Sequence, residues 1–246
     1  MRITNFYLLI IPIVGMLGVL SCKKNNDVPT VTLKTNLNIV NASADTVNFY
    51  LNGTRLNNNS NLYPLVSTGY LTNILAGPQN FQVKKMFNPV TSTVQTLFTI
   101  PLNLNANINY SLFIAGETSG DAFTTTDFTI AQATTLLNTT NNSDTAQNTS
   151  LIRFVNASPT AGNLDIAVGD TVKFTNVSFA KINPEGFTLI NSGTKTFSVY
   201  QTGTTTPLVT GTLLLSAGAA YTVYAKGALT GTNNSAFGIA YNLSFN

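Results

Sequence analysis

Cys22 carries the most distinctive chemistry in this sequence, and it is the only cysteine among the 246 residues. It follows an apolar run at residues 6–20 and the small Ser21, and a polar stretch comes directly after it. Together with the positive charge of Arg2, this is the pattern of a secretory signal that is removed from the mature chain. A cysteine just past the small residue makes the cut site an attachment point for lipid. We therefore expect residues 1–21 to be a cleaved signal peptide and Cys22 to be lipidated.

The four residues 19–22 read Val-Leu-Ser-Cys and resemble the lipobox of bacterial lipoproteins. The resemblance implies that a diacylglycerol is joined to the sulfur, that the chain is cut before Cys22, and that the new amine is acylated by a fatty acid such as palmitate. Several acyl chains together anchor firmly, at about 0.8 kcal/mol per buried methylene group. We expect a membrane anchor in the bacterial cell envelope, with residues 22–34 as a tether. Lys23 and Lys24 stand where some bacteria use aspartate for inner-membrane retention, which favours the outer membrane.

Two other interpretations of this segment are weaker. An uncleaved membrane helix needs about 20 apolar residues, and the run here is shorter and broken by Pro12, Gly15 and Gly18. A free cysteine is usually a small buried hydrophobe, which does not fit a position between a signal-like segment and a polar tether. Since no second cysteine exists for a disulfide, stability must come from packing and hydrogen bonds.

Catalytic and metal chemistry find few residues in this chain. It has no histidine, so the usual base of serine and cysteine hydrolases is missing, and zinc and haem sites lose their commonest ligands. Sugar hydrolysis needs two carboxylates about 5 to 10 Å apart; Asp165 and Asp170 are the nearest pair, but we interpret them as outward-facing strand and turn residues. A calcium site at Asp121 and Asp127 is a weak hypothesis, because it lacks clustered Asp-x-Asp spacing. We predict no enzyme activity, no cofactor and no metal.

Sites of modification are suggested by two short patterns. Residues 144–146, Asp-Thr-Ala, are similar to the triplet that some Gram-negative bacteria O-glycosylate, so Thr145 is a hypothetical O-glycosylation site. Asn41 and Asn156 begin Asn-Ala-Ser triplets that match the N-glycosylation pattern. In a bacterial lipoprotein we interpret these two side chains as hydrogen-bonding a turn or a strand end instead.

Composition excludes some partners. Charged residues make up only 9% of the chain and its formal net charge is +3, which is too weak a field for nucleic acid. Asn, Thr and Ser take the place of charge, which suits a secreted β-protein.

Aromatic side chains fall into two groups. We expect one group to pack in the core: Phe49, Phe81, Phe154 and Phe197. We expect the other group to be exposed and therefore able to bind a ligand: Tyr63, Tyr70, Tyr200 and Tyr224.

The body of the chain consists of two similar halves. Four blocks recur in the same order, including Val-Asn-Ala-Ser at residues 40–43 and 155–158. Each block alternates apolar and polar residues with period two and ends at Gly, Pro or Asn, which is typical of strands. A helix over residues 130–137 is disfavoured by its pair of threonines. We predict an all-β chain with two tandem immunoglobulin-like antiparallel β-sandwich domains, at residues 35–136 and 150–246, joined by an Asn- and Thr-rich linker at 137–149.

The second half is similar to the bacterial domain of unknown function 4397. The matching residues are Val-Asn-Ala-Ser-Pro at 155–159 and Leu-Ser-Ala-Gly-Ala-Ala-Tyr-Thr-Val at 215–223. The first half keeps the pattern Val-Asn-Phe-Tyr-Leu-Asn-Gly at 47–53 but has Ala44 in place of the proline. The family histidine is replaced by asparagine in both halves. The resemblance implies a fold and a cell-surface setting without a chemistry.

Three functions remain as hypotheses. The first is a non-enzymatic envelope lipoprotein with a structural, adhesive or ligand-binding role, held to the membrane by its lipid and in contact with an envelope protein or a glycan. The second is a glycan-binding accessory lipoprotein of a surface nutrient-uptake system, which exposed tyrosines clustered on a concave face would favour. The third, an enzyme, would require a pocket that holds two close carboxylates.

Overall fold

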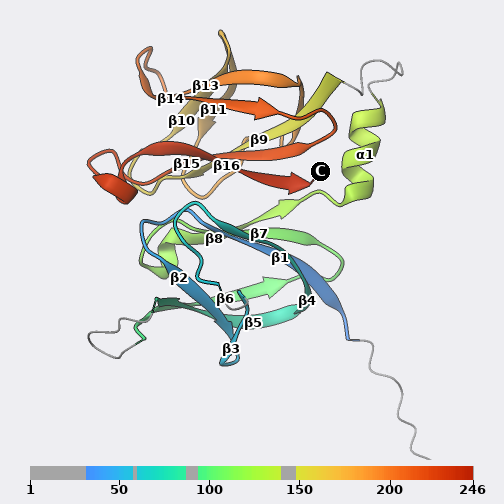
Figure 1. Cartoon of the computed structure of the whole chain (residues 1–246), viewed down its shortest axis with the longest axis vertical. Coiled ribbons are helices and arrows are strands. Elements are labelled where there is room, and N and C mark those ends of the chain that lie inside the picture. Colours follow the sequence, from blue (N-terminus) through green and yellow to red (C-terminus); the bar gives the residue numbers. More distant parts are fainter. Residues whose placement is uncertain (1–31, 58–59, 87–93, 140–147, 246) are drawn as a thin grey trace, which may run out of the picture. The chain divides into compact units, whose positions relative to one another are not determined.

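Two β-sandwiches follow one another along the chain in the computed structural model, which describes residues 32–57, 60–86, 94–139 and 148–245 (Figure 1). Residues 32–246 form one compact unit. Each sandwich consists of two four-stranded sheets. This confirms the prediction of an all-β chain with two tandem sandwiches. The predicted signal peptide lies outside the described residues.

The first sandwich pairs a sheet of strand order β4-β1-β7-β8 with a sheet of order β3-β2-β5-β6. Its strands are β1 (Lys34–Asn41), β2 (Val47–Leu51), β3 (Thr54–Arg55), β4 (Ser67–Leu75), β5 (Gly77–Lys85), β6 (Thr96–Leu104), β7 (Asn109–Ile114) and β8 (Ala122–Asp127), with a short 3-10 helix η1 (Ser119–Asp121) before β8.

The second sandwich repeats this arrangement with the orders β12-β9-β15-β16 and β11-β10-β13-β14. Its strands are β9 (Thr149–Ala157), β10 (Leu164–Val168), β11 (Thr171–Val177), β12 (Thr188–Asn191), β13 (Gly193–Gln201), β14 (Pro207–Leu215), β15 (Ala220–Lys226) and β16 (Gly238–Phe245), with the 3-10 helix η3 (Asn233–Ser235) before β16. Each sandwich has its own apolar core. The four phenylalanines predicted for the core are at most 2% exposed.

Each sandwich also contains one parallel strand pair, β1 with β7 and β9 with β15. The period-two pattern predicts strands but does not report their direction, so this departure from purely antiparallel pairing was not visible in the sequence. The parallel pair places the first and the seventh strand of each half side by side, although about 70 residues separate them. These two strands form the centre of the sheet that matters most below.

The repeated Val-Asn-Ala-Ser motif ties the end of the first strand of each half to the loops that follow. The buried side chain of Asn156 donates to the carbonyl oxygens of Gly162 (2.8 Å) and Val177 (2.9 Å) and accepts from the backbone N–H of Ser158 (3.1 Å). Asn41 makes the equivalent bonds in the first half. This confirms the interpretation of both asparagines as strand-end hydrogen-bonding groups.

The repeated Leu-x-Ala-x-x-x-Tyr block closes a turn in the same way in both halves. The hydroxyl of Tyr110 accepts a hydrogen bond from the backbone N–H of Asn105 (3.2 Å), and that of Tyr221 accepts one from Ser216 (3.0 Å). A tyrosine near a strand start that bonds back a few residues upstream is a feature of immunoglobulin-like sandwiches. The motif is therefore structural.

One local prediction was wrong: residues 130–139 form helix α1 (Ile130–Thr139). Its N-terminus carries a capping box, because the Thr129 hydroxyl accepts from the N–H of Gln132 (3.3 Å) while the Gln132 side chain accepts from the N–H of Thr129 (2.9 Å). These caps outweigh the poor helix propensity of the threonines. The helix extends into the predicted linker, whose residues 140–147 lie outside the described part. Among the described residues, no helix has the length and apolar content to cross a bilayer.

We predict that Asn156→Asp destabilises the protein by at least about 3 kcal/mol, because a carboxylate there would face two carbonyl oxygens without a proton to donate. Chemical denaturation of the variant and the parent would measure the loss. Asn80→Asp, at an exposed position on β5, serves as the control and should change stability by under about 0.5 kcal/mol. Equal effects of the two substitutions would contradict the structural role of the motif.

Candidate functional site

The two sandwiches contact each other through equivalent sheets, β4-β1-β7-β8 from the first half and β12-β9-β15-β16 from the second. An apolar cluster with residues from both sheets forms one part of this contact. In it the ring of Phe113 lies 5.4 Å from that of Phe123 and 5.6 Å from that of Tyr224. The outer faces of these sheets therefore bury side chains that an isolated sandwich would expose.

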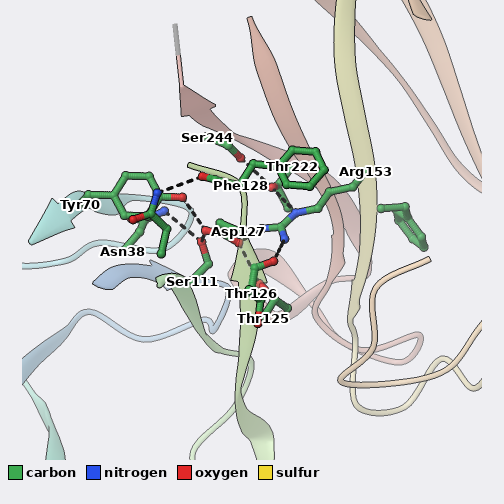
Figure 2. Close-up of polar contacts among 12 residues, drawn as sticks. Asn38, Tyr70, Ser111, Thr125, Thr126, Asp127, Phe128, Arg153, Thr222 and Ser244 are labelled. Atoms are coloured by element: carbon green, nitrogen blue, oxygen red, sulfur yellow. Dashed lines mark hydrogen bonds and ion pairs between the residues drawn. The ribbon is translucent and has the colours of Figure 1, made fainter. Parts of the chain in front are cut away.

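A buried ion pair forms the polar part of the same contact (Figure 2). Arg153, on β9, is 1% exposed and pairs with Asp127 at the end of β8. The Arg153 Nε donates to the Thr222 hydroxyl (2.8 Å), and an Nη donates to the carbonyl oxygen of Thr126 (2.9 Å). The guanidinium also lies over the ring of Phe187, 4.7 Å from its centroid. One cation from the second half thus binds an anion and a carbonyl of the first.

Asp127 is fully occupied by this network. One of its oxygens accepts from the hydroxyls of Tyr70 and Ser111, each at 2.5 Å, and the other binds Arg153. The Tyr70 hydroxyl is held in its protonated form: burial raises its pKa well above the usual value, and the negative charge of Asp127 adds to the effect. A carboxylate with its lone pairs engaged in this way can lock two surfaces together but cannot act as a free base.

The contact is built from matching positions of the two halves. In the aligned halves Asn38 of the first occupies the position of Arg153, and Ser111 that of Thr222. Ser244 stands in the second half where the first has Asp127, and its hydroxyl lies 2.8 Å from that of Thr222. The two halves therefore present the same face to each other, and at these positions the first supplies the anion Asp127 and the second the cation Arg153.

Two cavities adjoin these elements. One, of about 330 Å³, lies beside the ion pair and is lined by residues of both halves and of α1, among them Arg153, Asp127 and Phe187. The other, of about 490 Å³, is an apolar groove between β14 and β16. Its lining residues are Leu65, Phe197, Gly211, Thr212, Leu213, Val223, Ile239, Ala240 and Tyr241. Volumes of this size accommodate small ligands or a few side chains.

The candidate carboxylates from the sequence are not brought together in pairs. Asp165 accepts hydrogen bonds from the N–H of Asn176 and the hydroxyl of Thr202, each at 2.7 Å, and Asp170 lies exposed in the turn after β10. Asp121 and Asp127 lie at opposite ends of β8, so they do not form the hypothetical calcium site. Asp121 instead accepts from the Thr118 hydroxyl at 2.8 Å and caps η1.

The other predicted positions had mixed outcomes. Cys22 and Thr145 lie outside the described residues. Of the four tyrosines expected at the surface, Tyr63 is 55% exposed, whereas Tyr224 is fully buried against Phe113. That part of the prediction was wrong, because the alternation that points Tyr224 away from its own core points it into the first sandwich. Tyr70 and Tyr200 are half-buried.

Sequence reasoning missed the ion pair. The signal for it was a single arginine inside the apolar strand Leu-Ile-Arg-Phe-Val at residues 151–155. Charged residues are almost never buried without a partner, so an arginine in such a strand indicates a buried anion elsewhere. Asp127 is the anion, but nothing in the spacing along the chain identifies it.

We predict that removing either partner of the buried pair, by Asp127→Asn or Arg153→Met, lowers the free energy of unfolding by about 3–5 kcal/mol, since an uncompensated charge or donor set stays buried. The double variant D127N/R153M should lose less than the sum of the two single losses. Urea unfolding of the parent, the two single variants and the double variant gives the four free energies of this double-mutant cycle. As a control, Lys85→Met removes the exposed pairs with Asp45 and Glu117 and should cost under about 1 kcal/mol. Additive effects in the cycle would show that the two groups act independently.

We also predict a specific loss of stability at alkaline pH. Because the folded state raises the pKa of Tyr70, the neutral phenol contributes stability that is complete below the unfolded value near 10.0 and declines as pH rises above it. The extra loss of the parent over Tyr70→Phe should steepen above pH 10 and approach about 1.4 kcal/mol per pH unit between pH 11 and 12. Denaturant midpoints at several pH values measure this difference. Parallel curves for the two proteins would contradict the coupling of Tyr70 to the network.

Comparisons with known proteins agree with the repeat. The model of the family described as "Domain of unknown function (DUF4397)" matches residues 35–166 and 150–240. No curated protein matches the chain. Solved structures that match include a candidate cell adhesion protein from Bacteroides eggerthii DSM 20697, with 10% identity, coverage of 89% of this chain and 97% of that chain, and a TM-score of 0.20. That likeness is too low to support any conclusion on function. The family matches cover most of the sequence in two successive regions, and the chain therefore belongs to the DUF4397 family, with two copies of the domain in tandem.

Proposed function

We propose that this protein is a non-enzymatic cell-envelope lipoprotein, anchored in the outer membrane through acylated Cys22, whose double sandwich serves adhesion or ligand binding. The observation that carries the proposal is the buried Arg153–Asp127 pair. Its bonds reach from β9 of the second half to β8 of the first and make one unit of two sandwiches. A rigid unit of this kind holds its strand edges and loops in fixed positions, which is what a binding scaffold requires.

The use of acidic side chains supports the non-enzymatic part of the proposal. Asp127 is neutralised by Arg153, Asp165 ties β11 to the turn after β13, and Asp121 caps η1. Asp45 and Glu117 both bind Lys85 at the surface. Each of these carboxylates therefore has a structural bond that a catalytic acid or base would have to give up.

The anchor follows from the N-terminal sequence. A signal-like apolar segment that ends in Ser21-Cys22 leaves a short polar tether before Lys34, where β1 begins. Acyl chains on Cys22 would hold the first sandwich within a few tens of ångströms of the membrane, since an extended chain spans about 3.3–3.6 Å per residue. The sandwiches would then face the periplasm or the outside of the cell.

Glycan binding stays a separate hypothesis with less support. It needs flat aromatic side chains gathered on a concave surface, and in the described part of the chain Tyr224 is buried while Tyr70 is bonded to Asp127. A glycan array tests it directly, and saturable binding to one sugar would place it ahead of the first proposal.

We predict that the protein produced in bacteria incorporates labelled palmitate and that Cys22→Ser abolishes the labelling and leaves the signal peptide attached. Lys23→Ala, one residue away, keeps a thiol at the cut site and should be labelled like the parent. Fluorography and intact mass of the membrane fraction measure both properties. A parent chain that carries no label, or that retains residues 1–21, would overturn the anchor.

A further inference from the structure

The groove between β14 and β16 lies at an open margin of the second sandwich. Both strands are at the end of their sheets, so among the described residues each has one side without a strand partner. The ring of Tyr221 lies 6.2 Å from that of Tyr241, which is 54% exposed, and Leu243 on the same strand is 45% exposed. Large apolar side chains of the core face thus reach solvent here.

The first sandwich supplies an internal reference for this margin. Phe81 pairs with Ile100 across β5 and β6, and its counterpart Phe197 pairs with Gly211 across β13 and β14. Ile100 is 5% exposed and fills the space between the sheets, whereas Gly211 has no side chain to do so. A Cβ atom at Gly211 would lie 3.0 Å from the Cγ2 atom of Ile239. The Ile239 side chain therefore occupies the space that Ile100 fills in the first half, and the groove runs beside it along β14 and β16.

The free backbone of β14 also differs from that of its counterpart. Pro101 follows Ile100 in β6, and a proline within a strand is accommodated where its nitrogen faces away from the neighbouring strand. It leaves that edge without one N–H, a common protection of edge strands against pairing. Thr212 occupies the matching position in β14, so its N–H is directed to the open side and can pair with an added strand.

The wall of the groove that β16 forms also differs from its counterpart β8 in the first half. The residues of β8 that match Ile239, Tyr241 and Leu243 of β16 are Ala122, Thr124 and Thr126, as their pairing with β15 and β7 shows. Small or polar groups at the first margin are therefore replaced by three large apolar groups at the second. The strands β14 and β16 contain no charged residue, and neither does the lining of the groove.

We propose that this groove binds an extended, uncharged peptide segment of another protein by strand addition to β14, with alternate apolar side chains inserted between β14 and β16. Strand addition combines an unpaired backbone edge with pockets for every second side chain. Both features are present here, whereas in the first half Pro101 removes the matching edge N–H. An uncharged lining excludes acidic and basic segments, since a charge there would lose its hydration without a partner. The inference deepens the binding role proposed above by naming the class of ligand.

The test is a selection of random ten-residue peptides displayed on phage, carried out with the full chain as the cell processes it. We expect enriched peptides to alternate apolar and neutral polar residues and to lack charge. The counter-selection uses the variant Y241T/L243T, which introduces the residue type found at the matching positions of β8. Tyr63→Thr, which removes an exposed tyrosine that does not line the groove, is the matched control.

Affinities of the best synthetic peptide should fall by at least about 10-fold in Y241T/L243T and be unchanged in Tyr63→Thr. Thr212→Pro, the residue of the first half, should weaken binding to a similar extent, because it removes an edge N–H and leaves the apolar walls in place. Thermal unfolding verifies that each variant is folded. Methylation of the peptide's backbone nitrogens on the edge that faces β14 should abolish binding. Methylation of the nitrogens on its other edge should leave binding unchanged.

Three results would overturn the proposal. In the first, the selection yields no peptide that binds the parent better than Y241T/L243T. In the second, free palmitate binds more tightly than the selected peptides and displaces them. In the third, no peptide binds, and the parent self-associates whereas Y241T/L243T does not. The second would assign the groove to an acyl chain and the third to a second copy of this chain. Labelling at Cys22 is independent of each, so failure here leaves the membrane anchor intact.

Discussion

The ion pair between Arg153 and Asp127 determines how the two halves can associate. Each half presents the same sheet, so in principle two first halves or two second halves could pair as well. Two first halves would bury Asp127 against a copy of Asn38, and two second halves would bury Arg153 against a copy of Ser244. A buried charge without its counterion costs several kcal/mol. Only the combination of unlike halves neutralises both groups, and this selects association of the two domains of one chain over pairing between copies of the same domain.

Two of the differences between the halves matter for their association and for their sheet edges, and both lie outside the shared framework. The Val-Asn-Ala-Ser asparagines and the turn-closing tyrosines make the same bonds in each sandwich, so they cannot change without loss of the fold. These shared hydrogen bonds do not fix the face of β1 or β9 at the contact between the halves, nor the free edge of β6 or β14. At the first, asparagine and arginine exchange to set the contact between halves. At the second, Thr212 stands in place of Pro101, which leaves β14 with an edge N–H that β6 lacks.

Local patterns in the sequence predicted what depends on neighbouring residues. Alternation identified the strands and the core phenylalanines, and internal similarity identified the two halves, because period and repeat are properties of the chain itself. Helix α1 was missed although its cap is local, since the Thr129–Gln132 box was not weighed against the propensity of the threonines. The parallel pairs, the partner of Arg153 and the burial of Tyr224 depend on which sheets meet in space. No spacing along the chain carries that information, so Tyr224 was predicted to be exposed although the first sandwich covers it.

The low charge of the chain links its stability to its proposed role. With charged residues at 9% of the sequence, the protein has few ionic groups to protect its sheet edges, and in the first half Pro101 takes over that function for β6. An edge such as β14 that lacks this protection is an aggregation hazard unless it is covered. Its neutral, apolar groove would be costly to leave exposed on a molecule that, as proposed above, is anchored to a membrane beside neighbouring copies. Retention of such an edge in one half and closure of the same edge in the other is most simply explained if the open edge has a partner.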